Sequence, residues 1–488
     1  MRSSRLCPST RASLGSSPPL PDGIGCAISS TVPAAPEHCL TETHKSKMNM
    51  SKLSIPVAPF QGDDGLPDAV DVVIIGGGII GVTAALELAE RGVSVCLCEK
   101  GVIAGEQSSR NWGWTRQMGR DERELPLCMH SVDLWSRMNA RINRETGWRR
   151  SGISYLSYTK RELKNWMKWA EIGQRHGLDA RMLTRTEIAE RMPGNTGTLL
   201  GVLHTGSDGR AEPWIAVPAM AEAARELGAR IVTQCAVRSV ETSAGRVSAV
   251  VTERGEIRCQ AVVLAGGIWS RLFAGNFGID FPQLKVIGPV ARVDGVEGLT
   301  DMPVGAEDFA FRKRLDGSFT IAVRNLNLAP LTPDHLRLLR DFAPTYLQTW
   351  RELSLRLDNA FFRELAQKRR WQPTEETVFE HCRTMDPPSV PGFTRKALRN
   401  LSRQFPAFAK ARVLNEWSGV MDATPDAIPV ISPVESRPGF FMASGFSGHG
   451  FGIGPGAGEL VADLVTGDTP KVDPSVFSIS RLRKRYSA

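Results

Sequence analysis

Three glycine-rich segments hold most of the residues whose types and spacing could do chemistry in this chain. The first places Gly76, Gly78 and Gly81 in the pattern G-x-G-x-x-G, and the second, AVVLAGGIWS, spans 261–270. The third, SGFSGHGFGIGPGAGE, spans 444–459 and has apolar residues in most of the gaps between its glycines. Because glycine lets the main chain approach a ligand closely, the three segments predict a site built from backbone groups.

The elements around the first segment complete a strand–helix–strand unit. Val72–Ile75 is an all-apolar run that suits a buried parallel strand, and a helix is expected over Thr83–Arg91, ended by Gly92. A second strand, Val93–Cys98, ends directly before Glu99. A lone glycine pattern is weak evidence, whereas the same pattern inside a complete unit predicts dinucleotide binding.

Each residue of this unit has a separate physical task. Gly76 permits the tight turn, Gly78 lets a pyrophosphate approach the backbone, and Gly81 lets the helix pack closely on the strand. Free N–H groups at the start of the helix attract the phosphates. Glu99 can accept hydrogen bonds from ribose hydroxyls, and its charge would repel the 2′-phosphate of NADP.

The first unit alone does not decide between FAD and NAD. Further strands are expected at Arg230–Thr233, Val247–Thr252 and Gln260–Ala265, which we assign to the same sheet. The last of them ends in a glycine turn with Ala265, Gly266 and Trp269, as if to bring backbone against the same cofactor.

The three motifs in this order resemble the superfamily of D-amino-acid oxidase, glycine oxidase and sarcosine oxidase, over about residues 68–470. The segment SSRNWG at 108–113 resembles a loop of its bacterial branch of D-amino-acid dehydrogenases and gamma-glutamylputrescine oxidases. The resemblance implies FAD, with the first motif at its AMP half, the 108–111 loop along the pyrophosphate and flavin, and the last glycine segment at the isoalloxazine. Because SSRNWG offers no histidine for covalent attachment, non-covalent FAD is expected.

The cofactor contacts that follow from the motifs and the resemblance form one set. They are Gly76, Gly78, Ile79, Ile80, Gly81, Glu99, Lys100, Ser108, Ser109, Arg110, Asn111, Val237, Ala265, Gly266, Trp269, Gly445, Gly448, His449, Gly450, Phe451 and Gly452.

The third segment suits the flavin ring for an electrostatic reason. Negative charge develops at the N1–C2=O2 edge of a flavin that accepts a hydride, and N–H groups at a helix N-terminus stabilise such charge. Pro455 is expected to begin that helix. His449 is the polar side chain in the middle of the segment, and it either contacts flavin or substrate or simply fills space.

The expected fold is α/β: a Rossmann-like FAD-binding domain with an interleaved α+β substrate domain built on a mostly antiparallel sheet. A hairpin is expected within 308–325 around a Leu-Asp-Gly turn, and helices within 333–370. The expected divisions are a disordered extension at 1–67, an FAD-binding domain at 68–149, 204–275 and 415–470, a substrate domain at 150–203 and 276–414, and a tail at 471–488.

Oxidation of an amine C–N bond requires that the substrate be held and desolvated more than it requires acid–base groups. An amino-acid carboxylate would meet an arginine, and the candidates are Arg324, Arg292 and Arg116, which with His449 form the predicted catalytic set. Amino-acid members of the superfamily often carry an Arg-Pro pair where this chain has Met421, Asp422 and Ala423. Asp422 could attract a cationic amine or cap a loop.

The leading hypothesis is therefore an FAD-dependent oxidase or dehydrogenase of an amino acid or another primary or secondary amine. A 2-hydroxy-acid oxidoreductase and the flavin subunit of a multi-component amine dehydrogenase are the alternatives. The motifs leave the electron acceptor open among oxygen, a quinone and a protein.

Composition bounds the remaining possibilities. The 488 residues carry a net charge of +8 spread along the chain, without a nucleic-acid-binding motif or an apolar run of membrane-spanning length. The nine scattered cysteines include no C-x-x-C pair and no metal-ligand pattern, so reduced thiols and a cytoplasmic location are expected. Residues 1–67 are rich in Ser, Pro, Ala and Gly, and Met48 and Met50 are plausible alternative starts.

Overall fold

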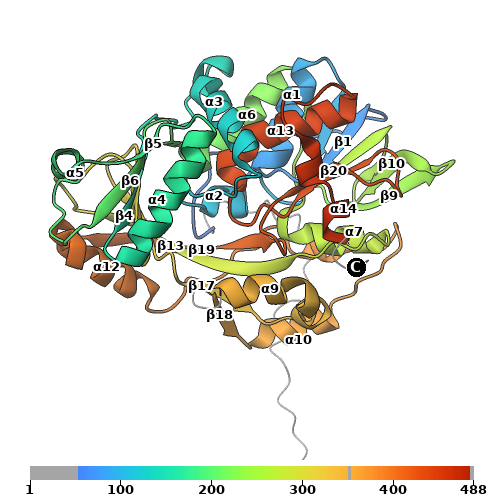
Figure 1. The fold of residues 1–488 in the computed structure, drawn as a ribbon. Helices are drawn as coiled ribbons and strands as arrows, with labels where there is room; N and C mark the ends of the chain where they lie inside the picture. The colour runs from blue at the N-terminus through green and yellow to red at the C-terminus, as the bar shows by residue number, and fades with distance from the viewer. Residues whose placement is uncertain (1–52, 350–352, 484–488) are drawn as a thin grey trace, which may run out of the picture. The chain divides into compact units, whose positions relative to one another are not determined.

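The computed structural model describes residues 53–349 and 353–483. Within them, a six-stranded sheet has the order β20-β21-β12-β1-β2-β8 (Figure 1). All neighbours in it are parallel except β20 and β21. The strands are β1 (Val72–Ile75), β2 (Val95–Cys98), β8 (Arg230–Val232), β12 (Ala261–Leu264), β20 (Val430–Pro433) and β21 (Phe440–Ser444).

Four helices, α1 (Ile79–Glu90), α3 (Leu125–Arg141), α6 (Pro213–Glu226) and α13 (Gly450–Thr466), pack together in this part of the fold. Helix α1 packs against both α6 and α13, and α13 also packs against α3. The contact between α1 and α13 is close, because a Cβ on Gly458 would lie 2.4 Å from the Thr83 hydroxyl. The first and third glycine segments, almost 370 residues apart, are thereby brought side by side.

The strand expected at Val247–Thr252 lies in another sheet. It forms β10 (Arg246–Thr252), which pairs antiparallel with β9 (Val237–Ser243) and β11 (Gly255–Arg258). Its mixed burial, from an exposed Arg246 to a buried Thr252, is that of a hairpin sheet and unlike the fully buried β1 and β12.

A ten-stranded sheet occupies the region that was expected to form the substrate domain. Its longest strands, β13 (Leu284–Asp294) and β19 (Arg412–Ala423), run antiparallel from Leu284 opposite Ala423 to Asp294 opposite Arg412. The other strands are β4 (Ile153–Ser157), β5 (Ala180–Met182), β6 (Gly201–Thr205), β14 (Val304–Gly305), β15 (Ala310–Lys313), β16 (Phe319–Ala322), β17 (Asn327–Pro330) and β18 (Leu353–Arg356). Most pairs are antiparallel, as expected, although β19 places residues up to 423 in this sheet, beyond the expected boundary at 415.

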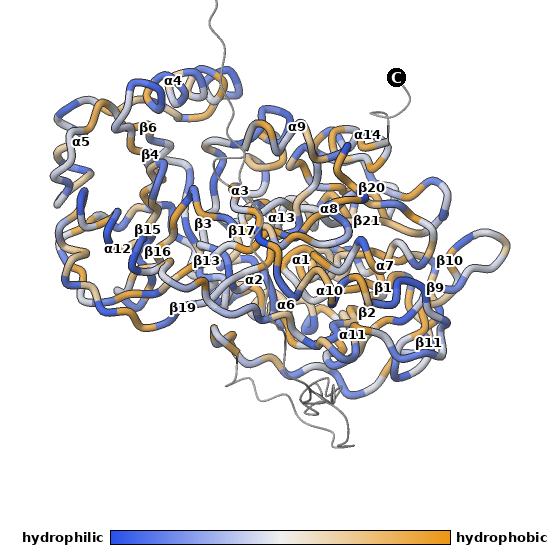
Figure 2. Tube along the Cα trace, turned by 90° about the horizontal axis from the view of Figure 1, so that it is seen from below, coloured by the Kyte–Doolittle hydropathy of each residue, from blue (hydrophilic) through white to orange (hydrophobic). Residues whose placement is uncertain are grey.

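The expected hairpin is formed by β15 and β16, with Gly317 at φ +81° in the turn. The remaining short elements connect the two large sheets or cover them. They are α2 (Gln107–Arg110), α4 (Lys160–Arg175), α5 (Arg185–Arg191), α7 (Ser270–Asn276), α11 (Val378–His381), α12 (Phe393–Gln404), α14 (Ser480–Arg483), β3 (Trp114–Thr115), β7 (Gly209–Arg210) and the 3₁₀ turns η2 (Gly267–Trp269), η3 (Pro406–Lys410) and η4 (Pro474–Phe477). Hydrophilic and hydrophobic residues alternate around α4 in Figure 2, as expected for a half-buried helix.

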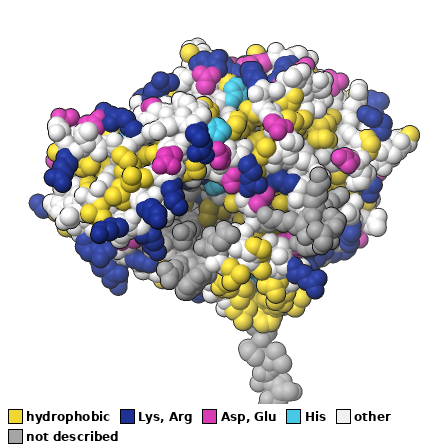
Figure 3. Space-filling model, in the orientation of Figure 1, with side chains coloured by type: hydrophobic (Ala, Val, Ile, Leu, Met, Phe, Trp, Pro, Cys, Tyr) yellow, Lys and Arg dark blue, Asp and Glu magenta, His cyan; other side chains and the backbone are white. Residues whose placement is uncertain are grey.

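Helices α8 (Pro333–Arg337), α9 (Leu339–Thr349) and α10 (Asn359–Ala366) confirm the helices expected in this region, with β18 between them. This segment carries many of the exposed large apolar side chains of the described residues, among them Leu347 and Phe362. Figure 3 shows apolar side chains gathered on the part of the surface where Figure 1 places α9 and α10.

One terminal expectation needs correction. Residues 53–67, expected to be disordered, pack on the fold, with Ile55 and Val57 buried and Ser54 bonded to Asp386. The tail expected at 471–488 contains η4 and α14, and its Phe477 is buried. Residues 1–52 lie outside the described part. Among the described residues, no helix is long and apolar enough to cross a membrane.

Candidate functional site

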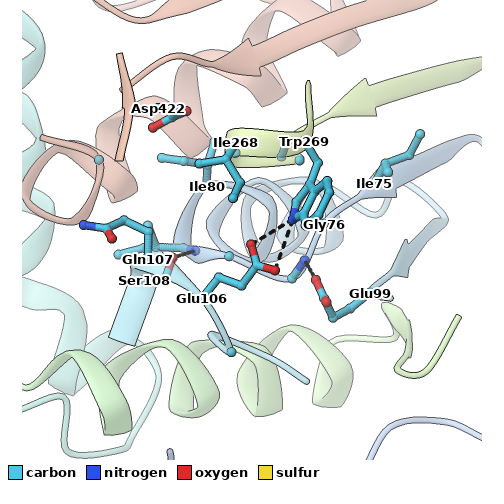
Figure 4. A pocket seen from close by; sticks show the side chains of 18 of the residues that line it. Ile75, Gly76, Ile80, Glu99, Glu106, Gln107, Ser108, Ile268, Trp269 and Asp422 are labelled. Carbon is cyan, nitrogen blue, oxygen red and sulfur yellow. Dashed lines mark hydrogen bonds between the residues drawn. The ribbon is translucent and has the colours of Figure 1, made fainter. Parts of the chain in front are cut away.

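A cavity lies where the three glycine segments meet, and residues of all three segments line it. Figure 4 shows Glu99 at one end of the cavity and Asp422 at the other. The predicted residues that line it are Gly76, Gly78, Ile79, Ile80, Glu99, Lys100, Ser108, Asn111, Val237, Ala265, Gly266, Trp269, Gly448, Gly450 and Phe451.

Glu99 closes the first end of the cavity, as predicted for a ribose-binding acid. Its Oε2 accepts the Gly77 N–H at 2.6 Å and its Oε1 accepts the Gly101 N–H at 2.7 Å. Burial raises the pKa of this carboxyl, while Lys100 and the two N–H groups oppose the rise. Each oxygen keeps a lone pair free, so the carboxylate can still accept ribose hydroxyls.

The turn between β1 and α1 shows why glycine is required. Gly76 has φ +114°, and a Cβ there would lie 2.5 Å from the Ala265 carbonyl oxygen. A Cβ on Gly81 would lie 2.0 Å from the Gly76 carbonyl oxygen. Gly81 therefore acts as predicted, by letting helix and strand pack closely. Ser108 Oγ accepts the Ile79 N–H at 2.9 Å, which ties the 108–111 loop to the first turn of α1.

The 108–111 loop mixes lining and structural residues. Asn111 lines the cavity, and its Oδ1 accepts the Gly113 N–H at 2.7 Å. Ser109 and Arg110 are fully buried outside the lining, where Arg110 forms an ion pair with Asp386 at 3.0 Å. Arg110 also donates to the Gly105 carbonyl, so its guanidinium holds the loop. A direct cofactor contact by Ser109 or Arg110 is therefore not shown.

Helix α13 begins at Gly450, five residues earlier than expected, so Pro455 lies inside the helix. Pro455 removes one backbone donor, and side chains of α3 stabilise the turns around it. Ser131 Oγ donates to the Gly452 carbonyl at 2.9 Å and accepts the Gly456 N–H at 3.1 Å. Trp135 donates to the same carbonyl at 3.0 Å. The helix thus directs its N-terminal end toward the cavity through Gly450 and Phe451.

Two more glycines of the last segment support the site without lining it. A Cβ on Gly452 would lie 3.1 Å from the Trp114 carbonyl oxygen, so this glycine lets β3 approach α13. Gly445 has φ +82°, and its N–H donates to Asp422 at 2.7 Å.

Sequence reasoning did not include Glu106 in the site. Its carboxylate accepts the Trp269 indole N–H at 3.0 Å and the Lys100 ammonium at 2.7 Å, in the middle of the cavity (Figure 4). The Lys100 ammonium also lies 4.8 Å from the centre of the Trp269 ring. The only signal in the sequence was the position of Glu106 two residues before SSRN. Because an acidic side chain would repel a nearby phosphate, this position did not indicate a cofactor contact.

Asp422 lies outside the predicted site set, although its position suggested a partner for a cationic amine or a loop cap. It lines the second end of the cavity, only 7% exposed, and its Oδ2 also lies 3.5 Å from the amide nitrogen of Gln283. Burial raises the pKa of this carboxyl to about 6, against the opposing hydrogen bond from Gly445.

His449 does not line the cavity. It precedes α13, and its Nδ1 faces Glu124 at 3.3 Å. Burial and the nearby Arg120 lower the pKa of the imidazole, while Glu124 opposes this shift. The structure thus gives His449 a partner in Glu124 and leaves a direct contact with flavin or substrate as a prediction.

The three predicted arginines do not line the cavity either. Arg292 is bound to Asp316 at 2.8 Å beside the β15–β16 turn, so we no longer assign it a substrate role. Arg324 and Arg116 lie 4.6 Å and 5.7 Å from the centre of the Tyr155 ring. No carboxylate of the described residues lies within 4.0 Å of either guanidinium, which leaves both charges available to an anion.

These features fit FAD. The cavity combines a ribose-binding acid, a helix start at Gly78 for phosphate and a second helix start at Gly450 for the flavin edge. Gly76 also shows a backbone cradle that any side chain would fill. Gly76–Ile80 and Ser108 would hold the pyrophosphate, and Gly448, Gly450 and Phe451 would meet the isoalloxazine.

Comparison with known proteins supports this assignment. The family model described as "DAO: FAD dependent oxidoreductase" matches residues 71–464. The structure of L-amino acid deaminase from Proteus vulgaris is 32% identical, with a TM-score of 0.83, over 87% of this chain and 100% of that chain. The Proteus myxofaciens enzyme, in complex with anthranilate, is 33% identical with a TM-score of 0.84, over 87% of this chain and 96% of that one.

Curated relatives are more distant. Mouse mitochondrial sarcosine dehydrogenase is 24% identical over 88% of this chain, and the chain spans only 42% of that protein. Glycine oxidase from Geobacillus kaustophilus is 24% identical over 84% of this chain and 97% of that protein. The comparisons confirm the superfamily and do not single out the expected bacterial branch. The chain belongs to the DAO family of FAD-dependent oxidoreductases.

Proposed function

We propose that this chain binds FAD non-covalently and oxidises the C–N bond of an amino acid to an imine, which water then hydrolyses. The observation that carries the proposal is the single cavity that joins all three glycine segments and ends at the N-terminus of α13. FAD supplies the two-electron acceptor of this reaction. The chain's task is to hold the substrate, exclude water and stabilise the charge that develops.

Helix α13 would stabilise the negative charge that develops on the flavin. Its first N–H groups have no partner within the helix, and the positive end of its dipole faces the cavity at Gly450 and Phe451. Gly448, Gly450 and Gly452 keep side chains away from this end, so the backbone itself can approach the flavin. The Ser131 and Trp135 bonds fix the helix in this position before any ligand binds.

An α-amino acid is the substrate class with the most support. Both L-amino acid deaminases are more than 30% identical to this chain, which covers nearly all of each. Arg324 and Arg116, without carboxylate partners around Tyr155, are the residues that we propose for the substrate carboxylate. Arg116 lies against the first turn of α13, because a Cβ on Gly452 would be 3.5 Å from its backbone nitrogen.

Non-covalent binding is supported by the composition of the lining. It contains no histidine, and its cysteines, Cys98 and Cys235, lie beside the Glu99 end. Acid precipitation of the holoprotein should therefore release all of the flavin into the supernatant. Flavin fluorescence that remains with the precipitated chain would contradict this part of the proposal.

The experiment for the function is anaerobic mixing of the holoprotein with a panel of L-amino acids, D-amino acids, simple amines and 2-hydroxy acids. We expect loss of the oxidised-flavin absorbance with L-amino acids and none with 2-hydroxy acids. Reduction by 2-hydroxy acids alone would establish the alternative reaction. Admission of air afterwards distinguishes rapid reoxidation by oxygen from dependence on a quinone or protein acceptor.

A further inference from the structure

Asp422 is a buried carboxylate for which the fold provides no cation. No lysine, arginine or histidine of the described residues lies within 4.0 Å of its oxygens. The N–H of Gly445 and the amide of Gln283 both approach Oδ2, and neither carries a charge. An ionised carboxylate that is almost fully removed from water is costly unless a positive group approaches it.

The charged groups on the elements around Asp422 are all committed elsewhere. Lys285 is opposite Asp422 in the β13–β19 register, and its ammonium pairs with Glu364 at 2.6 Å. Arg271, whose backbone N–H donates to Gln283, pairs with Asp334 at 3.2 Å and with Asp280 at 3.0 Å. The missing positive group must therefore come from the cavity that Asp422 lines.

Asp422 lies at the end of the cavity where the amine of a substrate would be oxidised. Its strand, β19, brings Val420 and Asp422 to the same end of the cavity as Gly448, Gly450 and Phe451. Figure 4 shows Ile80 and Ile268 near Asp422, away from the charged side chains of Glu99 and Glu106. An amine bound at this end meets one carboxylate in largely apolar surroundings.

We propose that Asp422 holds the ammonium group of the substrate and accepts one of its protons before the C–N bond is oxidised. This inference rests on the proposed function. The N–H bond breaks, the proton moves to Asp422 and the nitrogen keeps the electron pair. Bound FAD would accept the electron pair of the α C–H bond, and the lone pair that the nitrogen has kept would form the C=N bond. The protonated Asp422 returns its proton to water or to the departing product.

The ionisation of Asp422 suits this role. With a pKa of about 6 it is charged at neutral pH, while a free amine of pKa about 8 to 10 is protonated. Carboxylate and ammonium therefore meet as an ion pair. The low polarity of the site favours proton transfer within that pair, because both partners become neutral.

The test uses Asp422→Asn in the full-length holoprotein, with L-phenylalanine as substrate and 3-phenylpropanoate as the analogue without the amino group. We expect kcat/KM for L-phenylalanine to fall by about 10²-fold at neutral pH, the usual scale of a lost proton acceptor. The deficit should shrink as pH rises past the pKa of the free amine, because the substrate then arrives neutral. Binding of 3-phenylpropanoate, measured by its perturbation of the flavin spectrum, should change less than about twofold, since that ligand lacks the ammonium group.

Two controls make the result specific. Glu416→Gln changes an exposed carboxylate on the same strand and should leave all of these quantities unchanged. Asp422→Glu keeps the charge and should restore part of the activity. A constant Asp422→Asn deficit at every pH, or equal losses for the two ligands, would overturn the proposal. Reduction by amines with no effect of Asp422→Asn refutes this inference alone, whereas a wild-type flavin that no amine reduces refutes the proposed function itself.

Discussion

Several glycines of the cavity act mainly because they lack a side chain. Gly76 and Gly81 each omit a Cβ that would collide with a carbonyl oxygen, that of Ala265 for Gly76 and that of Gly76 for Gly81. The polar side chains are few and lie at separate points: Glu99 at one end, Glu106 in the middle and Asp422 at the other end (Figure 4). This arrangement leaves backbone N–H groups as the principal contacts for phosphate and flavin.

Gly81→Ala tests the close packing at the first turn. Its Cβ would lie 2.0 Å from the Gly76 carbonyl oxygen, so the turn must shift. We expect the free energy of unfolding to fall by about 1–3 kcal/mol or more and FAD to be retained poorly. Urea unfolding and the flavin-to-protein ratio measure both effects.

The matched control is Gly275→Ala, because a Cβ there would meet nothing within 4 Å. It should unfold at nearly the wild-type urea concentration and keep its flavin. Equal behaviour of the two variants would show that the turn accommodates a methyl group.

Asp208 gives a prediction for pH. It is fully buried, it accepts the Gln117 N–H at 2.7 Å, and burial raises the pKa of its carboxyl from 3.8 to about 6. Between these values the folded state keeps a proton that the unfolded state has released. The contribution of Asp208 to stability therefore falls as pH rises through this window, by roughly 2–3 kcal/mol in total.

The measurement is the free energy of unfolding of the wild type minus that of Asp208→Asn, which cancels the other titrating groups. This difference should fall between about pH 4 and pH 6 and be constant above that range. A difference that rises with pH in the same window would reverse the sign and contradict the assignment.

At the scale of the element, α13 is the part of the fold that most clearly depends on its neighbours. Its first turns are rich in glycine and contain Pro455, so they are intrinsically weak helix formers. Helix α3 compensates through Ser131, which joins the Gly452 carbonyl to the Gly456 N–H around the proline.

Ser131→Ala should therefore leave two buried backbone groups less satisfied and destabilise the protein by about 1–3 kcal/mol. In the flavin-free protein, α13 should be destabilised more than distant helices. Faster hydrogen exchange of the 450–458 amides would report this local effect. Ser136→Ala, on the exposed side of the same helix α3, is the control and should be nearly neutral. Similar exchange in both variants would remove Ser131 from this role.

The sequence predicted the elements that depend on local patterns. The strand–helix–strand unit at 72–98, the hairpin of β15 and β16 and the paired glycine segments all follow from periodicity and turn residues. Two predictions were wrong: the sheet assigned to β10 and the residue at which α13 begins. Strand pairing and helix starts depend on tertiary partners such as β9 and Ser131. The partners of His449 and Arg292 could not be predicted, since Glu124 and Asp316 are brought to them only by the fold.

For the whole molecule, the open question is whether one chain suffices. This chain spans 42% of mouse sarcosine dehydrogenase but all of the Proteus vulgaris deaminase chain. We expect the isolated protein to oxidise its substrate with a small artificial dye as electron acceptor. If turnover appears only after another protein is added, the flavin-subunit alternative would be correct.

We expect a flavin bound in this cavity to take two electrons from an amino acid. The most direct measurement is the visible spectrum of the oxygen-free holoprotein before and after addition of an L-amino acid. The absorbance of oxidised flavin should disappear, and a keto acid and ammonia should form in a one-to-one ratio with reduced flavin. An unchanged spectrum with every amino acid and amine, from a protein that holds a full complement of FAD, would contradict it.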